Sequence, residues 1–162
     1  SGANWGAAAE DYPLGGWQKV METNMTGAFL FSQIAGRLMI RQKRGNIINI
    51  ASIMGIIGME SEVADAIAYS ASKGALIAFT KDLAAKWAKF NIRVNAIAPG
   101  WFPTEMTQWV LEHHGEKLLS HIPMRRFGEE DDLKGAILFL ASEASRYVTG
   151  AIIPVDGGYL AM

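Results

Sequence analysis

The alternation of apolar and polar positions predicts three strands separated by long helices. Short β-branched runs are typical of buried strands, and longer stretches with apolar residues three and four positions apart are typical of helices. The pattern predicts strands over residues 46–52, 92–98 and 150–155, and helices over residues 17–41, 63–89 and 129–141. Residues 1–16 resemble a loop, and residues 104–121 one or two short helices broken at Gly115. Strands that alternate with long helices indicate parallel βαβ units, and therefore the α/β class.

The surfaces of these elements indicate what covers them. The first two strands are almost continuously apolar, as expected of parallel strands covered on both faces. Pro154 lies inside the third strand, which we therefore expect at a sheet edge. The helices over 17–41 and 63–89 are apolar or alanine-rich almost all round, which predicts burial on two sides. One side faces the sheet and the other is expected to face another subunit; the alternative is a large monomeric core.

Composition restricts the classes of protein that remain. The chain has 162 residues, which suits a single domain over residues 1–162. Its 15 basic and 16 acidic residues leave a net charge of −1, so we expect no nucleic acid as partner. Apolar runs are interrupted well short of the roughly 18 residues that span a bilayer, so we expect no membrane either. The lack of cysteine excludes disulfides, thiolate metal sites and a cysteine nucleophile, and fits a cytoplasmic location.

Candidate chemistry gathers where two strands end. In open parallel sheets, ligands bind beyond the carboxyl ends of the strands, which selects Ser52 and the Pro99-Gly100 turn. Tyr69 and Lys73 lie four residues apart on a following helix, hence on one face. A nearby ammonium lowers the pKa of a phenol from about 10, and Ser52 would hydrogen-bond the oxygen that exchanges a proton with Tyr69. On this spacing alone, a half-exposed tyrosine beside a solvated lysine is the alternative.

Five short motifs stand in a fixed order along the chain. They are NMTGAF around Asn24, INIAS ending at Ser52, YSASKGA beginning at Tyr69, VNAIAPG ending at Gly100, and DGG beginning at Asp156. In this order they resemble the motifs of the short-chain dehydrogenase/reductase family, and the resemblance covers essentially the whole chain. The fold that it implies is a Rossmann-like, doubly wound parallel sheet.

The resemblance implies reversible hydride transfer between NAD or NADP and a small-molecule carbonyl or secondary alcohol. In it, Tyr69 is the general acid/base, Lys73 lowers its pKa and holds the nicotinamide ribose, and Ser52 polarises the substrate carbonyl. Asn24 anchors a water that links Lys73 to solvent. The other residues that the resemblance assigns to cofactor binding are Gly2, Pro99, Gly100, Phe102 and Thr104.

The same resemblance implies that part of the family fold is missing. Residues 1–3 (SGA) resemble the end of the family's NNAG motif, which lies beyond its fourth strand. The stretch GANWGAA superficially resembles a pyrophosphate-binding loop, but no strand precedes it and Pro13 follows where a helix should run. We therefore expect a C-terminal catalytic portion without the first βαβαβ half. Such a chain alone should bind neither cofactor tightly, and the residue that selects NAD or NADP is not in it.

The segment 101–124 resembles the family's substrate lid and is rich in apolar side chains. Such a lid suits an acyl or other partly apolar substrate. The stretches APGWFPTEMT and IPVDGG resemble those of 3-oxoacyl reductase-like members, so the resemblance implies an enzyme of that kind. A gluconate-type sugar-acid dehydrogenase is the alternative within the family, and a non-catalytic oligomerising remnant the alternative outside it. His113, His114 and His121 have no cysteine or acidic cluster beside them, and no metal site is expected.

The two long helices bear on assembly. Residues 17–41 and 63–89 resemble the helices at the family's dimer interface. The resemblance therefore implies a homo-oligomer, a dimer or a homotetramer, that associates through these helices.

Overall fold

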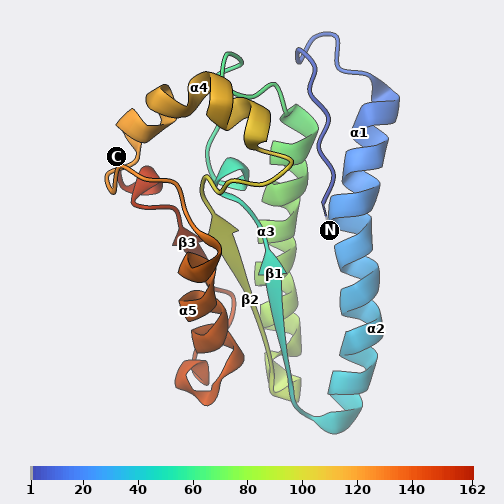
Figure 1. The fold of residues 1–162 in the computed structure, drawn as a ribbon. Helices are drawn as coiled ribbons and strands as arrows, with labels where there is room; N and C mark the ends of the chain where they lie inside the picture. The colour runs from blue at the N-terminus through green and yellow to red at the C-terminus, as the bar shows by residue number, and fades with distance from the viewer. Residues whose placement is uncertain (1) are drawn as a thin grey trace.

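The structure, a computed structural model, describes residues 2–162 and contains a parallel sheet in the order β1-β2-β3 (Figure 1). The strands are β1 (Gly45–Ile50), β2 (Ile92–Pro99) and β3 (Ile152–Val155). Both pairs of neighbours run parallel, which confirms the predicted α/β class. Pro154 lies in β3, which pairs only with β2 among the described residues and is therefore an edge strand, as predicted. A proline has no N–H to donate to a neighbouring strand, so an edge position suits it. Ser1, the first residue of the SGA motif, lies outside the described residues.

The helices alternate with these strands. They are α1 (Leu14–Met21), a π-helical turn (Glu22–Thr26), α2 (Gly27–Gln42), α3 (Ile67–Trp87), α4 (Gln108–His121) and α5 (Glu130–Ala141). Short 3₁₀ turns follow at Ile53–Gly55, Ala88–Phe90, Glu143–Ser145 and Tyr159–Ala161. No helix among residues 2–162 is both long enough and apolar enough to cross a membrane.

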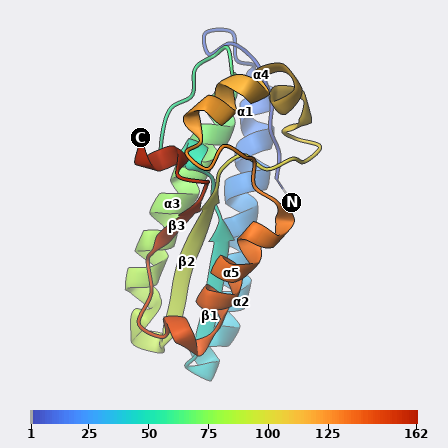
Figure 2. The ribbon, with the colours of Figure 1, turned by 60° about the vertical axis from the view of Figure 1, so that its left-hand side comes forward.

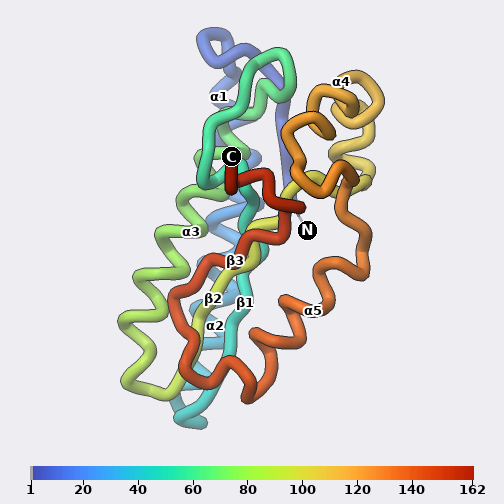
Figure 3. Tube along the Cα trace, turned by 90° about the vertical axis from the view of Figure 1, so that its left-hand side faces the viewer, coloured from blue at the N-terminus to red at the C-terminus, as the bar shows by residue number. Residues whose placement is uncertain are grey.

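The elements form three layers. Figure 3 shows α2 and α3 on one face of the sheet and α5 on the other. Helix α4 lies across the end of the molecule at which the strands finish (Figure 2). The central strand β2 is the most buried element: Val94, Ala96, Ile97 and Ala98 are fully enclosed. Both faces of this strand are thus covered, as its continuous apolar run predicts.

Asn95 is a polar residue in the middle of this buried strand, and its hydrogen bonds explain its presence. Its Nδ2 donates to the Val148 carbonyl oxygen at 3.0 Å, and its Oδ1 accepts the Ala151 N–H at 3.0 Å. A buried amide is tolerated when its polar atoms are paired. Asn95 therefore ties the loop that leads into β3 to the central strand.

Several predicted bounds were wrong. The first long helix begins at Leu14 rather than at residue 17 and contains a π-helical turn, and the last strand begins at Ile152 rather than at residue 150. The second long helix begins at Ile67 rather than at residue 63, because the preceding residues fold as a loop whose Val63 and Ala66 are buried. Helix α4 runs through Gly115 without the predicted break. Leu118 is almost fully buried in the core on the next turn of α4, and this packing outweighs the cost of about 1 kcal/mol for a glycine inside a helix.

Candidate active site

Ser52 follows β1 at the carboxyl end of the sheet. It caps the 3₁₀ turn Ile53–Gly55, where its Oγ accepts the Met54 N–H at 3.2 Å. The side chain is buried, and it lines a pocket beside Tyr69. The rule that ligands bind where parallel strands end therefore selected a residue that the fold does place in a cavity.

Tyr69 and Lys73 lie on the first two turns of α3, the helix packed against β2 and against the 3₁₀ turn Ile53–Gly55 that follows Ser52. The Lys73 ammonium is buried and lies 5.5 Å from the centroid of the Tyr69 ring. Its Nζ donates to the Ile50 carbonyl oxygen at 2.7 Å. Burial lowers the pKa of the Lys73 ammonium, because an enclosed charge is poorly solvated. The alternative of a solvated lysine on a helix surface is thereby wrong.

The pKa of the Tyr69 phenol moves in the direction opposite to the one predicted. Burial raises this pKa, and hydrogen bonding with the Ser52 hydroxyl only partly offsets the rise. Lys73 was expected to lower it, but the effect of burial is the larger one. In the structure as it stands, Tyr69 therefore holds its proton throughout the neutral range.

Gly55 is a residue that the sequence did not single out. A Cβ at this position would lie 2.6 Å from the Lys73 carbonyl carbon and 2.7 Å from the Gly74 nitrogen. Only glycine allows the turn after Ser52 to approach the backbone of α3 so closely. The contact sets how far Ser52 stands from the helix that carries Lys73. A glycine three residues after the candidate serine was the one signal available in the sequence.

Asn24 lies in the π-helical turn between α1 and α2 and is buried. Its Oδ1 accepts the Ala3 N–H at 2.8 Å, and its Nδ2 donates to the Ala3 carbonyl oxygen at 2.9 Å and to Ser72 Oγ at 3.0 Å. π-Helical turns occur frequently at functional sites. Gly2 lies beside this amide, where an added Cβ would meet Asn24 Oδ1 at an unstrained 3.7 Å.

The turn after β2 is held by a close approach of Gly100 to Asp156 and by the hydroxyl of Thr107. A Cβ on Gly100 would lie 2.8 Å from the Asp156 Cα, so glycine is required for the turn to pass the end of β3. Thr107 Oγ1 donates to the Phe102 carbonyl oxygen at 2.5 Å and lies 2.9 Å from the exposed Thr104 Oγ1. Thr107 also accepts the Thr104 N–H at 3.0 Å. This second threonine, which sequence reasoning missed, fixes the shape of the turn.

A mainly apolar pocket lies beside Ser52 and Tyr69. Its lining is Asn4, Ser52, Ile53, Met54, Ala64, Ala66, Tyr69, Gly100, Trp101, Met106, Thr107 and Val110. No charged side chain occurs among these lining residues. Trp109, in contrast, does not line the pocket: it is 60% exposed and stacks on His113 with 4.4 Å between ring centroids.

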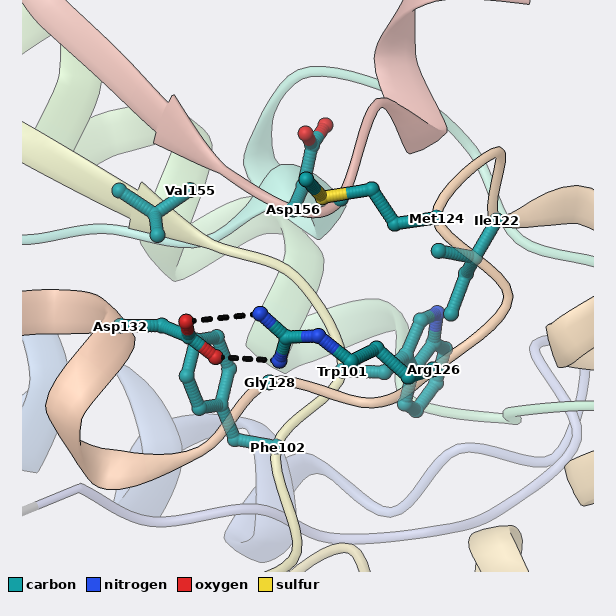
Figure 4. A pocket seen from close by; sticks show the side chains of 10 residues that line it. Trp101, Phe102, Ile122, Met124, Arg126, Gly128, Asp132, Val155 and Asp156 are labelled. Carbon is teal, nitrogen blue, oxygen red and sulfur yellow. Dashed lines mark hydrogen bonds and ion pairs between the residues drawn. The ribbon is translucent and has the colours of Figure 1, made fainter.

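A second hollow shares Trp101 and is lined on another side by Arg126 and Asp132 (Figure 4). The Arg126 guanidinium donates to both oxygens of Asp132, at 2.6 and 2.9 Å, and holds the pKa of that carboxyl well below its usual range. Asp156, also in the lining, accepts the backbone N–H groups of Gly158 and Leu160. Because both carboxylates are engaged in holding the local structure, the pocket at Ser52 and Tyr69 is the better candidate for chemistry.

The fold and this site place the chain among α/β proteins with a Rossmann-like parallel sheet. Residues 2–160 match a family model described as enoyl-(acyl carrier protein) reductase. The chain belongs to the short-chain dehydrogenase/reductase family.

Similar proteins have several activities. The chain is 44% identical to 2-dehydro-3-deoxy-D-gluconate 5-dehydrogenase of Bacillus subtilis (strain 168), over 94% of this chain and 59% of that protein. It is 42% identical to a 3-oxoacyl-(acyl-carrier-protein) reductase of Aquifex aeolicus (strain VF5), over 88% of this chain and 56% of that protein. A crystal structure of a gluconate 5-dehydrogenase from Burkholderia cenocepacia J2315, in complex with NADP and tartrate, superposes with a TM-score of 0.95 at 34% identity. That match covers 100% of this chain and 63% of the other, so the chain spans about three fifths of the length of these relatives.

Proposed function

We propose that the protein carrying this chain is an NAD(P)-dependent oxidoreductase that interconverts a carbonyl and a secondary alcohol. The observation that carries the proposal is the convergence of Ser52 and Tyr69, from two separate elements, on one pocket, with the buried Lys73 ammonium beside the Tyr69 ring. This arrangement disfavours the alternative of a non-catalytic remnant. In such a protein, burying the charge of Lys73 would lower the stability of the fold without serving any reaction.

Each of the three residues has a role that its surroundings support. The Tyr69 phenol, protonated at neutral pH, donates its proton to the substrate oxygen during reduction and takes one back during oxidation. Ser52, which lines the same pocket as Tyr69, orients and polarises the same substrate oxygen. Lys73 places a positive charge beside the Tyr69 ring, where it stabilises the phenolate once the proton has left.

The residues present fit a nicotinamide cofactor. An ammonium has three N–H donors, and the Ile50 carbonyl oxygen is the acceptor of one from Lys73, which leaves donors for ribose hydroxyls. The Thr104 hydroxyl is paired with Thr107 and keeps lone pairs for the N–H of a carboxamide, beside the Phe102 backbone. Pro99 ends β2, Gly100 passes close to Asp156 beyond β3, and Gly2 lies beside Asn24 and Met106. When bound, the cofactor supplies or accepts the hydride.

Among the described residues, no glycine-rich turn leads from a strand into an α-helix, the usual device for holding a pyrophosphate. The choice between NAD and NADP is therefore not assigned to any residue of this chain. Relatives crystallised with NADP support a dinucleotide as the cofactor.

The substrate we propose is a 3-oxoacyl compound. The pocket beside Tyr69 offers apolar walls from both the turn at Ile53 and the lid at Met106 and Val110, and it has no cation for a carboxylate. A gluconate-type sugar acid is the second candidate, which the 44% identity to a deoxygluconate dehydrogenase favours. Such a substrate would bring a carboxylate and several hydroxyls to walls with few polar partners.

The lid in this proposal is the segment 101–124. Its C-terminal part is anchored, because Leu118 and Ile122 are buried in the same cluster as Ile53 and Trp101. Its N-terminal part supplies Met106 and Val110 to the pocket. Trp101, the first residue of the lid, is buried in this cluster too, so the lid is fixed at both ends and faces the pocket between them.

We also propose a cytoplasmic homo-oligomer, of tetrameric form, that associates through the helices at residues 17–41 and 63–89. Exposed apolar side chains gather on the first of these: Phe29, Leu30, Phe31, Ile34 and Leu38. Apolar faces of this kind are typical of interfaces between subunits.

Initial rates on the complete protein test the activity and the substrate together. We expect reduction of an acetoacetyl thioester with NADH or NADPH to have a higher kcat/KM than oxidation of gluconate with NAD or NADP. A clear preference for gluconate would replace the 3-oxoacyl proposal by the sugar-acid one. Failure with both classes, together with a folded oligomer, would favour the non-catalytic alternative.

A further inference from the structure

Ser72 lies between Tyr69 and Lys73 on α3 and is completely enclosed. Its hydroxyl donates to the Tyr69 carbonyl oxygen at 2.7 Å, one turn back on the same helix. A serine bonded to its own helix in this way has its single proton committed, while its oxygen can still accept a hydrogen bond.

The donor to that oxygen is Asn24 Nδ2, at 3.0 Å. The directions in this network are fixed by chemistry. The Ala3 N–H can only donate, so it faces Asn24 Oδ1, and the amide nitrogen must then face the Ala3 carbonyl oxygen and Ser72. The network thus joins three segments that are far apart in sequence: residues 2–4, the π-helical turn and the catalytic helix.

One end of this network lies at the substrate pocket. Asn4, the neighbour of Ala3, lines the pocket together with Tyr69. Because Asn24 binds both backbone polar groups of Ala3, the position of Asn4 follows that of the Asn24 amide. Ser72 is the group that holds this amide against α3.

We propose that Ser72 is a positioning residue for the reaction: through Asn24 it fixes the pocket wall at residues 2–4 against the helix that carries Tyr69 and Lys73. The proposal rests on the proposed function of this site. Ser72 itself touches neither substrate nor cofactor in it.

The test is Ser72→Ala in the complete protein, with Ser70→Ala, on the same helix and only partly buried, as the matched control. Without the acceptor, one N–H of a buried amide has no partner, and we expect kcat to fall about tenfold or more. KM should change less than about twofold, because the apolar walls remain. Ser70→Ala should leave both constants unchanged.

Two further measurements separate positioning from a general loss of structure. Hydrogen exchange of the peptide containing Ala3 should become faster in Ser72→Ala and not in Ser70→Ala, because the Ala3 N–H depends on Asn24. In a double-mutant cycle, Ser72→Ala should have little further effect on kcat in an Asn24→Ala background. Additive effects of the two substitutions, or unchanged exchange, would overturn the proposal.

If Ser72→Ala does not fold, Ser72→Cys decides, since a thiol keeps the side chain in place but weakens both hydrogen bonds. It should lower kcat and speed exchange at Ala3, and wild-type values of both would overturn the proposal. Tyr69→Phe distinguishes failure of the proposed function from failure of the positioning role of Ser72. If Tyr69→Phe is active, the proposed function fails; if it is inactive while Ser72→Ala matches Ser70→Ala, only the positioning role fails.

Discussion

Gly55→Ala probes the closest backbone contact in the candidate active site. The new Cβ would lie 2.6 Å from the Lys73 carbonyl carbon, whereas ordinary contact begins near 3.4 Å. The turn that begins after Ser52 must therefore move away from α3 by about 0.8 Å, because the atoms it meets are backbone. A misplacement of about 1 Å in an active site can cost about a hundredfold in rate.

We therefore expect Gly55→Ala to lower kcat by about ten- to a hundredfold and to destabilise the fold by about 1–3 kcal/mol, the usual cost of overpacking. Gly58→Ala is the matched control, because nothing lies within 4 Å of a Cβ there. The assay is steady-state carbonyl reduction by the complete protein, with Tm measured on the same samples. A Gly55→Ala variant with the kcat and Tm of the Gly58→Ala variant would refute the reasoning.

Four other outcomes are expected. Tyr69→Phe should keep the fold and lower kcat by about 10²–10⁴-fold, and a near-parental kcat in steady-state assays would remove Tyr69 from the mechanism. Because burial raises the pKa of Tyr69, its phenol stays protonated as the pH rises through neutrality. The rate of reduction should therefore stay level through neutral pH and decline only in the alkaline range, where the rate of oxidation should increase. A rate of reduction that already declines as the pH rises toward 7 would contradict this. Met106→Ala should raise KM for a longer acyl substrate about three- to tenfold, at about 25 cal/mol per Å² of lost contact, whereas Trp109→Ala, outside the pocket, should not; equal effects would argue against the lid assignment. A soluble, monodisperse protein of residues 1–162 should show no tight binding of NAD(H) or NADP(H) by isothermal titration, and micromolar affinity would show that other residues hold the pyrophosphate.

The oligomer proposal and the Ser72 proposal depend on different surfaces of the same helices. The apolar residues of α2 named above are exposed, whereas Asn24 and Ser72 are buried and hydrogen-bonded to each other. A substitution such as Phe31→Ser, at an exposed position, therefore tests the proposed assembly without touching the network at Asn24. This separation allows the two proposals to be tested independently.

The sequence by itself determined the order and type of the elements and the three residues at the centre of the candidate site. β-Branched runs and helical spacing are local signals, and Ser52, Tyr69 and Lys73 were selected from the ends of strands and the spacing on one helix. The edge position of the strand that contains Pro154 was predicted because proline lacks the N–H that a central strand needs. Each of these conclusions needs information from only a few neighbouring residues.

Tertiary structure decided the properties that depend on distant segments. Helix α4 continues through Gly115 because Leu118 is buried in a core that the local sequence does not show. The pKa of Tyr69 rises rather than falls because burial depends on everything packed around the ring, which a spacing of four residues does not reveal. The close approach at Gly55 was likewise out of reach of the sequence, since the contact joins residues on elements whose relative position is set only when the chain packs.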